Sequence, residues 1–147
     1  MQLIIREANS EDLLGILELY NQPDMDNGMV LSQEQAEIIF KKIATYPNYK
    51  VFVALDNEKI VGTFALAIMD NLAHMGATSG LIEDVVVKKD CQGMGIGKQM
   101  MKYALEYCRE YGCYKVALSS NIKREMAHDF YKSLGFKIHG YSFLLEL

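Results

Sequence analysis

The sequence predicts a single α/β (α+β) domain spanning residues 1–147, with one mixed, mostly antiparallel sheet of about six to seven strands and about four helices. Two observations predict this class. Aliphatic and β-branched runs alternate with segments of helical periodicity along the chain, without an internal repeat or a linker. Residues 81–119 also read as strand, glycine-rich turn, helix and strand, the order of a right-handed crossover between two parallel strands.

The elements can be placed in order along the chain. Residues 3–6 form the first strand, and Ser10 caps a helix that extends to about Tyr20. A capping box at 32–35 begins a second helix, which ends before Pro47. The other expected elements are a hairpin of 51–55 and 60–68, a strand at 81–87, a helix at 95–111, a strand at 115–119, a helix at 124–134 and a final strand pair in 136–147.

The composition limits the kind of partner. The formal net charge is −4 and no run of lysine or arginine forms a basic patch, so we expect no nucleic-acid partner. No apolar run approaches the length of a membrane span, and the first residues lack the features of a signal peptide. The cysteines, Cys91, Cys108 and Cys113, have no zinc-site spacing, so we expect reduced thiols, a cytoplasmic location and no metal.

A glycine-rich turn between the strand at 81–87 and the next helix is the main functional signal. Gly93, Gly95 and Gly97 lack the Cβ atoms that would keep a ligand away from the main chain, and Gln92 adds a side-chain donor. The free N–H groups of such a turn, at a helix N-terminus, bind phosphate oxygens. The spacing fits neither a P-loop nor a dinucleotide fingerprint, because Lys98 stands where the latter requires its third glycine.

Two separated motifs resemble those of the GNAT acetyltransferase superfamily. The segment 92–97 matches Q/R-x-x-G-x-G/A, the loop that holds the pyrophosphate of acetyl-CoA in that superfamily, and 127–136 is similar to its C-terminal motif A-x-x-F-Y-x-x-x-G-F. The order of elements resembles the GNAT fold as well. The resemblance implies acetyl-CoA as co-substrate, bound by the backbone of Val85, Val86 and Val87, by the loop residues Gln92, Gly93, Met94, Gly95, Ile96, Gly97 and Lys98, and by Asn121 and Tyr131.

Two adjacent carboxylates, Glu83 and Asp84, lie within an otherwise apolar strand. Their desolvation there is unfavourable unless each has an ion-pairing partner or a functional role. Strict alternation places Glu83 on one face with Val85 and Val87, and Asp84 on the other. An attacking amine must lose a proton, and we interpret Glu83 as the general base. A structural ion pair is the alternative for each carboxylate. The strand resembles that of glucosamine-phosphate N-acetyltransferases, whose acidic positions face the substrate.

Tyr131 is the candidate general acid for the leaving thiolate, since a phenol is protonated at neutral pH. Core packing is the alternative for this side chain. Ser119 is a further candidate for the acceptor site, beside Glu83 and Asp84. The loops at 23–31 and 70–80 are expected to close the pocket.

The expected function is therefore acetyl-CoA-dependent N-acetylation of a primary amine on a small molecule, with a homodimer as the candidate assembly. The chain between 118 and 131 resembles aminoalkylphosphonate and antibiotic N-acetyltransferases, so the acceptor stays open among several small amines. The two carboxylates and the net charge favour a cationic acceptor. A protein lysine or N-terminal acetyltransferase, and a non-catalytic acetyl-CoA-binding module, remain the alternatives.

Overall fold

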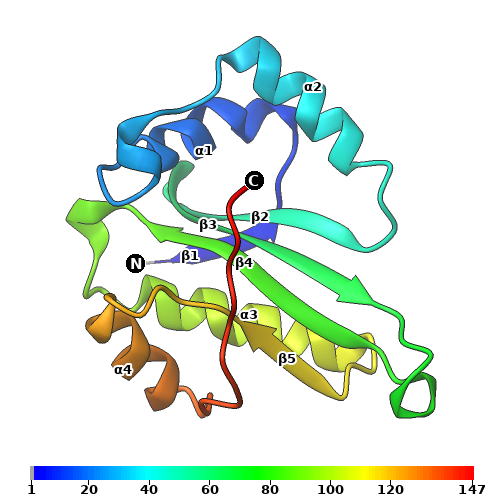
Figure 1. Ribbon diagram of the computed structural model, residues 1–147. Coiled ribbons are helices and arrows are strands. Elements are labelled where there is room, and N and C mark those ends of the chain that lie inside the picture. Colours follow the sequence, from blue (N-terminus) through cyan, green and yellow to red (C-terminus); the bar gives the residue numbers. More distant parts are fainter. Residues whose placement is uncertain (1) are drawn as a thin grey trace. The chain divides into compact units, whose positions relative to one another are not determined.

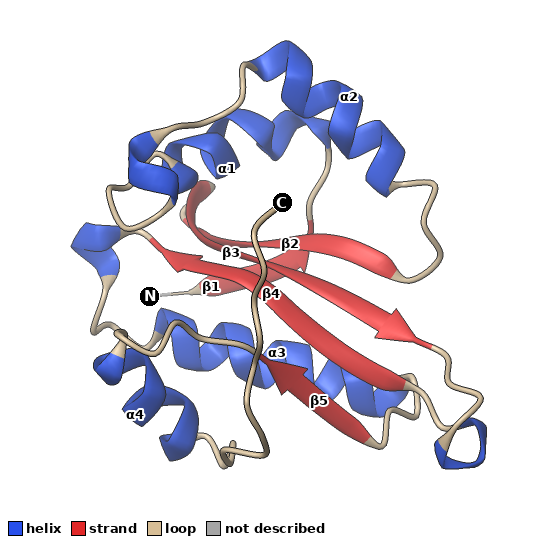
Figure 2. Ribbon diagram, in the orientation of Figure 1, coloured by secondary structure: helices blue, strands red, loops and turns tan. Residues whose placement is uncertain are grey.

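The computed structural model describes residues 2–147, in two compact units that are considered separately: 2–117 and 118–147. The first unit contains a five-stranded sheet in the order β1-β2-β3-β4-β5 (Figures 1 and 2). The strands are β1 (Leu3–Glu7), β2 (Tyr49–Asp56), β3 (Lys59–Met69), β4 (Ser79–Val87) and β5 (Lys115–Leu118). The helices are α1 (Leu13–Tyr20), α2 (Gln33–Ile43), α3 (Ile96–Glu110) and, in the second unit, α4 (Glu125–Ser133), with short 3-10 turns at Ser10–Asp12, Asp26–Gly28, His74–Gly76 and Lys89–Cys91.

The predicted mixed sheet and the four helices are confirmed. Strands β1 to β4 pair antiparallel with their neighbours, and β5 runs beside β4 in the same direction after the crossover through α3 (Figure 1). The β2–β3 hairpin turns at Asn57 and Glu58, both of which have positive φ, as a type I′ hairpin turn requires. None of the described helices is long and apolar enough to span a bilayer.

Helices cover both faces of the sheet, with α1 and α2 on one face and α3 on the other (Figure 2). On the α3 face, Phe52 and Phe64 stack with ring centroids 5.0 Å apart. The edges of Tyr103 and Tyr107 contact Phe52 at 5.7 and 5.2 Å, so α3 is fixed by aromatic packing. On the opposite face, Ile16 of α1 packs on Val53.

The start of α1 differs from the prediction. Asn9, and not Ser10, is the capping residue, because its side-chain oxygen accepts a hydrogen bond from the Glu11 N–H at 2.9 Å. Asp12 completes the capping box by accepting from the Asn9 N–H at 2.8 Å, and its carboxylate is held in two bonds by Arg6 at 2.7 and 2.9 Å. A 3-10 turn therefore precedes α1. The predicted capping box at the start of α2 is confirmed, since Ser32 and Gln35 form it.

The prediction of six to seven strands is wrong, because the described residues form five. The difference lies in 136–147, where no strand forms. Alternating apolar residues give a segment the tendency to extend, but a strand also needs a partner for its backbone groups. Here the large side chains remain exposed, with Tyr141 at 91% and Phe143 at 92% of their full exposure.

Candidate active site

A β-bulge in β4 places the acidic pair. Thr63 of β3 pairs with Val86 and Ala65 pairs with Glu83, so the two residues Asp84 and Val85 stand opposite the single Phe64. Asp84 takes up the extra length with a φ of 53°, a left-handed conformation that aspartate tolerates better than most residues.

The bulge overturns the predicted alternation. Directly paired residues of an antiparallel ladder share a face, so Glu83 lies on the face of Ala65 and Val86 on that of Thr63. Thr63 and Ala65 are two residues apart on β3 and therefore also share a face. Glu83 consequently lies on the face of Val86, and not with Val85 and Val87. The inserted residue shifts the alternation of side chains between the two faces by one position.

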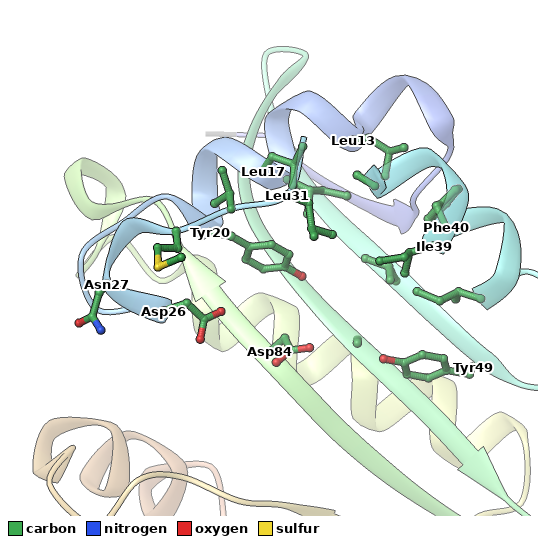
Figure 3. Close-up of a pocket in the computed structure, with 17 residues that line it drawn as sticks. Leu13, Leu17, Tyr20, Asp26, Asn27, Leu31, Ile39, Phe40, Tyr49 and Asp84 are labelled. Atoms are coloured by element: carbon green, nitrogen blue, oxygen red, sulfur yellow. The ribbon is translucent and has the colours of Figure 1, made fainter. Parts of the chain in front are cut away.

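Asp84 faces a cavity of about 710 Å³ under α1 and α2 (Figure 3). Figure 3 shows the hydroxyl groups of Tyr20 and Tyr49 directed toward the Asp84 carboxylate, with Asp26 beside it. Ala65 belongs to the floor of the cavity, so its strand partner Glu83 lies on the same side of the sheet, next to the cavity. The two carboxylates thus lie on one side of the sheet, with Asp84 lining the cavity and Glu83 next to it, although the sequence pattern separates them.

The electrostatics of this site are perturbed. Asp84 keeps an exposed edge toward solvent, but partial desolvation by the surrounding protein, together with the charge of Asp26, raises the pKa of its carboxyl. Burial followed by the charge of Asp84 also raises the pKa of Tyr20 and of Tyr49, so both phenols are protonated at neutral pH. Tyr49 in addition feels the charge of Glu83.

The expected loops contribute unequally to the cavity. The segment 26–31 lines it, as predicted for the connection between α1 and α2, while the 70–80 loop supplies none of its lining residues. Tyr20, Tyr49 and Asp26 were not among the site residues predicted from the sequence. No local signal marks them, because α1, β2 and β4 are brought together only by the fold.

The glycine loop forms the predicted open helix end. Gly93 and Gly95 have φ of 79° and 82°, and a Cβ built on either would meet no atom within 4 Å. Gly95 is the N-cap residue of α3, and no side chain caps this end of the helix. The first N–H groups of α3 are therefore available to an anion, and open space lies where a phosphate would approach.

Gln22 holds this loop from a distant part of the chain. Its side-chain amide donates to the Val87 carbonyl at 3.3 Å, and its side-chain oxygen accepts from the Lys89 N–H at 2.6 Å. Gln92 donates to the same carbonyl of Val87 at 3.3 Å. In the loop, Ile96 is buried at 1% exposure and can contribute only its backbone, whereas Gln92, Met94 and Lys98 are exposed.

The second unit carries the remaining predicted residues. Tyr131 of α4 packs between the rings of Phe130 and Phe136, with centroids 5.2 and 5.9 Å away. Burial raises the pKa of the Tyr131 phenol, while Arg124 works in the opposite direction. Asn121 accepts a hydrogen bond from the Lys123 N–H at 2.9 Å, and Ser119 is exposed.

Known proteins resemble this chain over most of its length. The profile described as "Acetyltransferase (GNAT) family" matches residues 7–136. The chain is 39% identical over 98 residues to the glucosamine 6-phosphate N-acetyltransferase of Trypanosoma brucei brucei, and the match covers 67% of this chain and 65% of that protein. It is 36% identical over 101 residues to the aminoalkylphosphonate N-acetyltransferase of Salmonella typhimurium, covering 69% and 65%. The matches thus span about two thirds of the length of both relatives.

A solved structure gives the same result for the fold. A putative acetyltransferase from Agrobacterium tumefaciens superposes with a TM-score of 0.90 at 31% identity, over 98% of this chain and 99% of that one. The resemblance inferred from the glycine loop and the C-terminal motif is confirmed by these matches. On this basis the chain belongs to the GNAT acetyltransferase family.

Proposed function

We propose that this protein transfers the acetyl group of acetyl-CoA to the primary amine of a small molecule by direct attack. The observation that carries the proposal is the course of β4. This strand brings Asp84 into a cavity and Glu83 beside it, and then, after Val87, leads into the glycine loop at the start of α3. One strand therefore connects an acidic cavity with an anion-binding helix end.

The named activities of the relatives support the same class of reaction. Both are named as N-acetyltransferases, one of glucosamine 6-phosphate and the other of aminoalkylphosphonates. These acceptors are small molecules with an amino group, and we carry over that class and not the individual acceptor.

The donor side is formed mainly by backbone groups. Bound acetyl-CoA would supply an acetyl group activated as a thioester. The N–H groups of 93–98 would bind its phosphates, since Gly93 and Gly95 leave the approach open. We assign the amides of Val85 to Val87 to the acyl and pantetheine portion, as the resemblance implies, and Asn121 to the same portion.

On the acceptor side, the amine has to be deprotonated before it attacks. An alkylammonium has a pKa of about 10.4 and no lone pair in that form. We assign proton removal to Glu83, directly or through water, because it is exposed and lies next to the cavity. Asp84 would hold the ammonium group before transfer. The leaving thiolate would receive its proton from Tyr131, whose raised pKa keeps the phenol protonated.

A panel of acceptors tests the proposal. The purified chain is incubated with acetyl-CoA and one acceptor at a time, and the released CoA thiol is measured. The panel contains apolar amines, a polyamine, glucosamine 6-phosphate, 2-aminoethylphosphonate, and peptides with a lysine or a free N-terminus. Turnover with small amines is the expected result. Turnover confined to the peptides would make it a protein acetyltransferase, and binding of acetyl-CoA without any turnover would make it a binding module.

A further inference from the structure

The cavity has an uneven distribution of polar groups. Its 17 lining residues include 12 with hydrocarbon or thioether side chains, ten of them from α1, α2 and the segment between these helices. The polar atoms nearest the sheet belong to Asp84, Asp26, Tyr20 and Tyr49 (Figure 3). The site thus has an acidic end at the sheet and an apolar end between the helices.

The acidic end lacks a balancing cation within the first unit. No lysine, arginine or histidine lines the cavity, and in residues 2–117 neither Asp84 nor Asp26 forms an ion pair. The charge of Asp26 disfavours the ionised form of Asp84 and raises the pKa of its carboxyl. A bound cation would relieve this repulsion.

We propose that the cavity binds a primary amine carried on an apolar alkyl or aryl-alkyl body, with the ammonium group at Asp84 and the body against Leu13, Ile39 and Phe40. This inference rests on the proposed acetyl transfer and adds the acceptor class. The volume of about 710 Å³ lies within the usual range for small-molecule sites, so a body the size of an aromatic ring fits. Burial of that body at the apolar end supplies the binding free energy.

A phosphorylated amine would be rejected by the same features. Its dianion would enter an apolar space that offers no cationic side chain from the first unit and would approach two carboxylates. An unpaired charge in such surroundings is strongly disfavoured. Within residues 2–117, the cavity therefore offers no basic anchor to a phosphorylated acceptor.

A matched pair of acceptors measures the preference. Tyramine and tyramine O-phosphate share the ring and the amine and differ by the phosphate. We expect kcat/KM for tyramine to exceed that for the phosphate ester at least tenfold, about 1.4 kcal/mol. A preference for the phosphate ester would overturn the inference and leave the acetyltransferase function intact. If no amine is acetylated, the proposed function fails. In that case a rise of the thermal midpoint with tyramine, and none with its phosphate, still supports the assignment of the cavity.

A matched pair of variants on α2 ties the preference to this cavity. Ile39 lines the cavity and is 44% exposed, while its neighbour Ile38 is 64% exposed and does not line it. Ile39→Lys places a cation at the apolar end, and Ile38→Lys places one on the outer surface of the same helix. We expect Ile39→Lys to lower kcat/KM for tyramine at least tenfold and to raise it for the phosphate ester. Ile38→Lys should leave both values unchanged, and equal effects of the two variants would overturn the assignment.

Asp84→Asn tests the ammonium end separately. The substitution keeps the shape of the side chain and removes its charge. We expect the KM for tyramine to rise about tenfold or more, while inhibition by the neutral analogue 2-(4-hydroxyphenyl)ethanol stays the same. An unchanged KM would show that Asp84 does not hold the amine, and equal weakening of both compounds would show a change of cavity shape instead.

Discussion

Gly95→Ala is the sharpest test of the acetyl-CoA site, because the structure provides its control. Gly95 precedes α3 and Gly112 follows it, with φ of 82° and 74°, and a Cβ at either position would meet nothing within 4 Å. An alanine in the left-handed region costs about 1–2 kcal/mol. For a chain of 147 residues this corresponds to a loss of about 2–8 °C in the thermal midpoint, in Gly95→Ala and Gly112→Ala alike.

Binding should separate the two variants. At a ligand concentration of 100 times the Kd, binding stabilises a protein by about 2.7 kcal/mol, and each tenfold loss of affinity removes about 1.4 kcal/mol of that. The methyl group of Gly95→Ala occupies the space through which a phosphate would approach, so we expect at least a tenfold weaker Kd for acetyl-CoA. Thermal unfolding with and without acetyl-CoA, and calorimetric titration, measure both quantities. Equal affinity in the two variants would refute the assignment of the phosphate site to this loop.

Three further predictions concern the proposed proton transfers and an ion pair. Glu83→Gln should lower kcat/KM by about 10²–10⁴ with acetyl-CoA affinity unchanged, and full activity at neutral pH would exclude a base there. Tyr131→Phe should lower kcat without moving the thermal midpoint, so wild-type turnover would leave Tyr131 as a packing residue. Burial works to raise the pKa of Asp12, but the bonds from Arg6 and Asn9 outweigh it and lower that pKa below 3.8. Asp12→Asn should therefore lower the free energy of unfolding by about 1–2 kcal/mol at pH 7, as measured with urea, a value that allows for the partly exposed Arg6. The difference in this free energy between wild type and variant should shrink as the pH falls below 3.8, because Asp12 then becomes protonated. A difference that stays constant over this pH range would contradict the prediction.

The parts of the fold that follow local rules could be predicted from the sequence. The Ser32–Gln35 capping box and the β2–β3 hairpin depend on residues within a few positions of one another. The glycine loop was placed correctly for the same reason, since Gly93 and Gly95 determine the local backbone by themselves. By contrast, the hydrogen bonds of Gln22 to Val87 and Lys89 join positions 65 and 67 residues apart, and no short pattern encodes them.

The C-terminal segment shows a different limit. A strand pair around Gly140 was predicted in 136–147, and apolar residues do alternate with polar ones over part of this segment. Alternation describes which side chains would share a face, but it does not supply the hydrogen-bonding partner that makes a strand. The described segment has no such partner, and Tyr141 and Phe143 remain exposed.

The carboxylate pair lies where the alternation of side chains along β4 is interrupted, and the candidate site lies at the same place. In a regular strand, two adjacent residues point to opposite faces, so Glu83 and Asp84 would never meet at one cavity. The bulge opposite Phe64 adds one residue, and Asp84 absorbs it in a left-handed conformation that few other side chains accept. An aspartate inside an apolar strand was therefore a usable signal for the bulge, since it combines tolerance of that backbone with a polar side chain. The bulge that interrupts the alternation of the strand also places a second carboxylate on the side of the sheet that faces the cavity under α1 and α2.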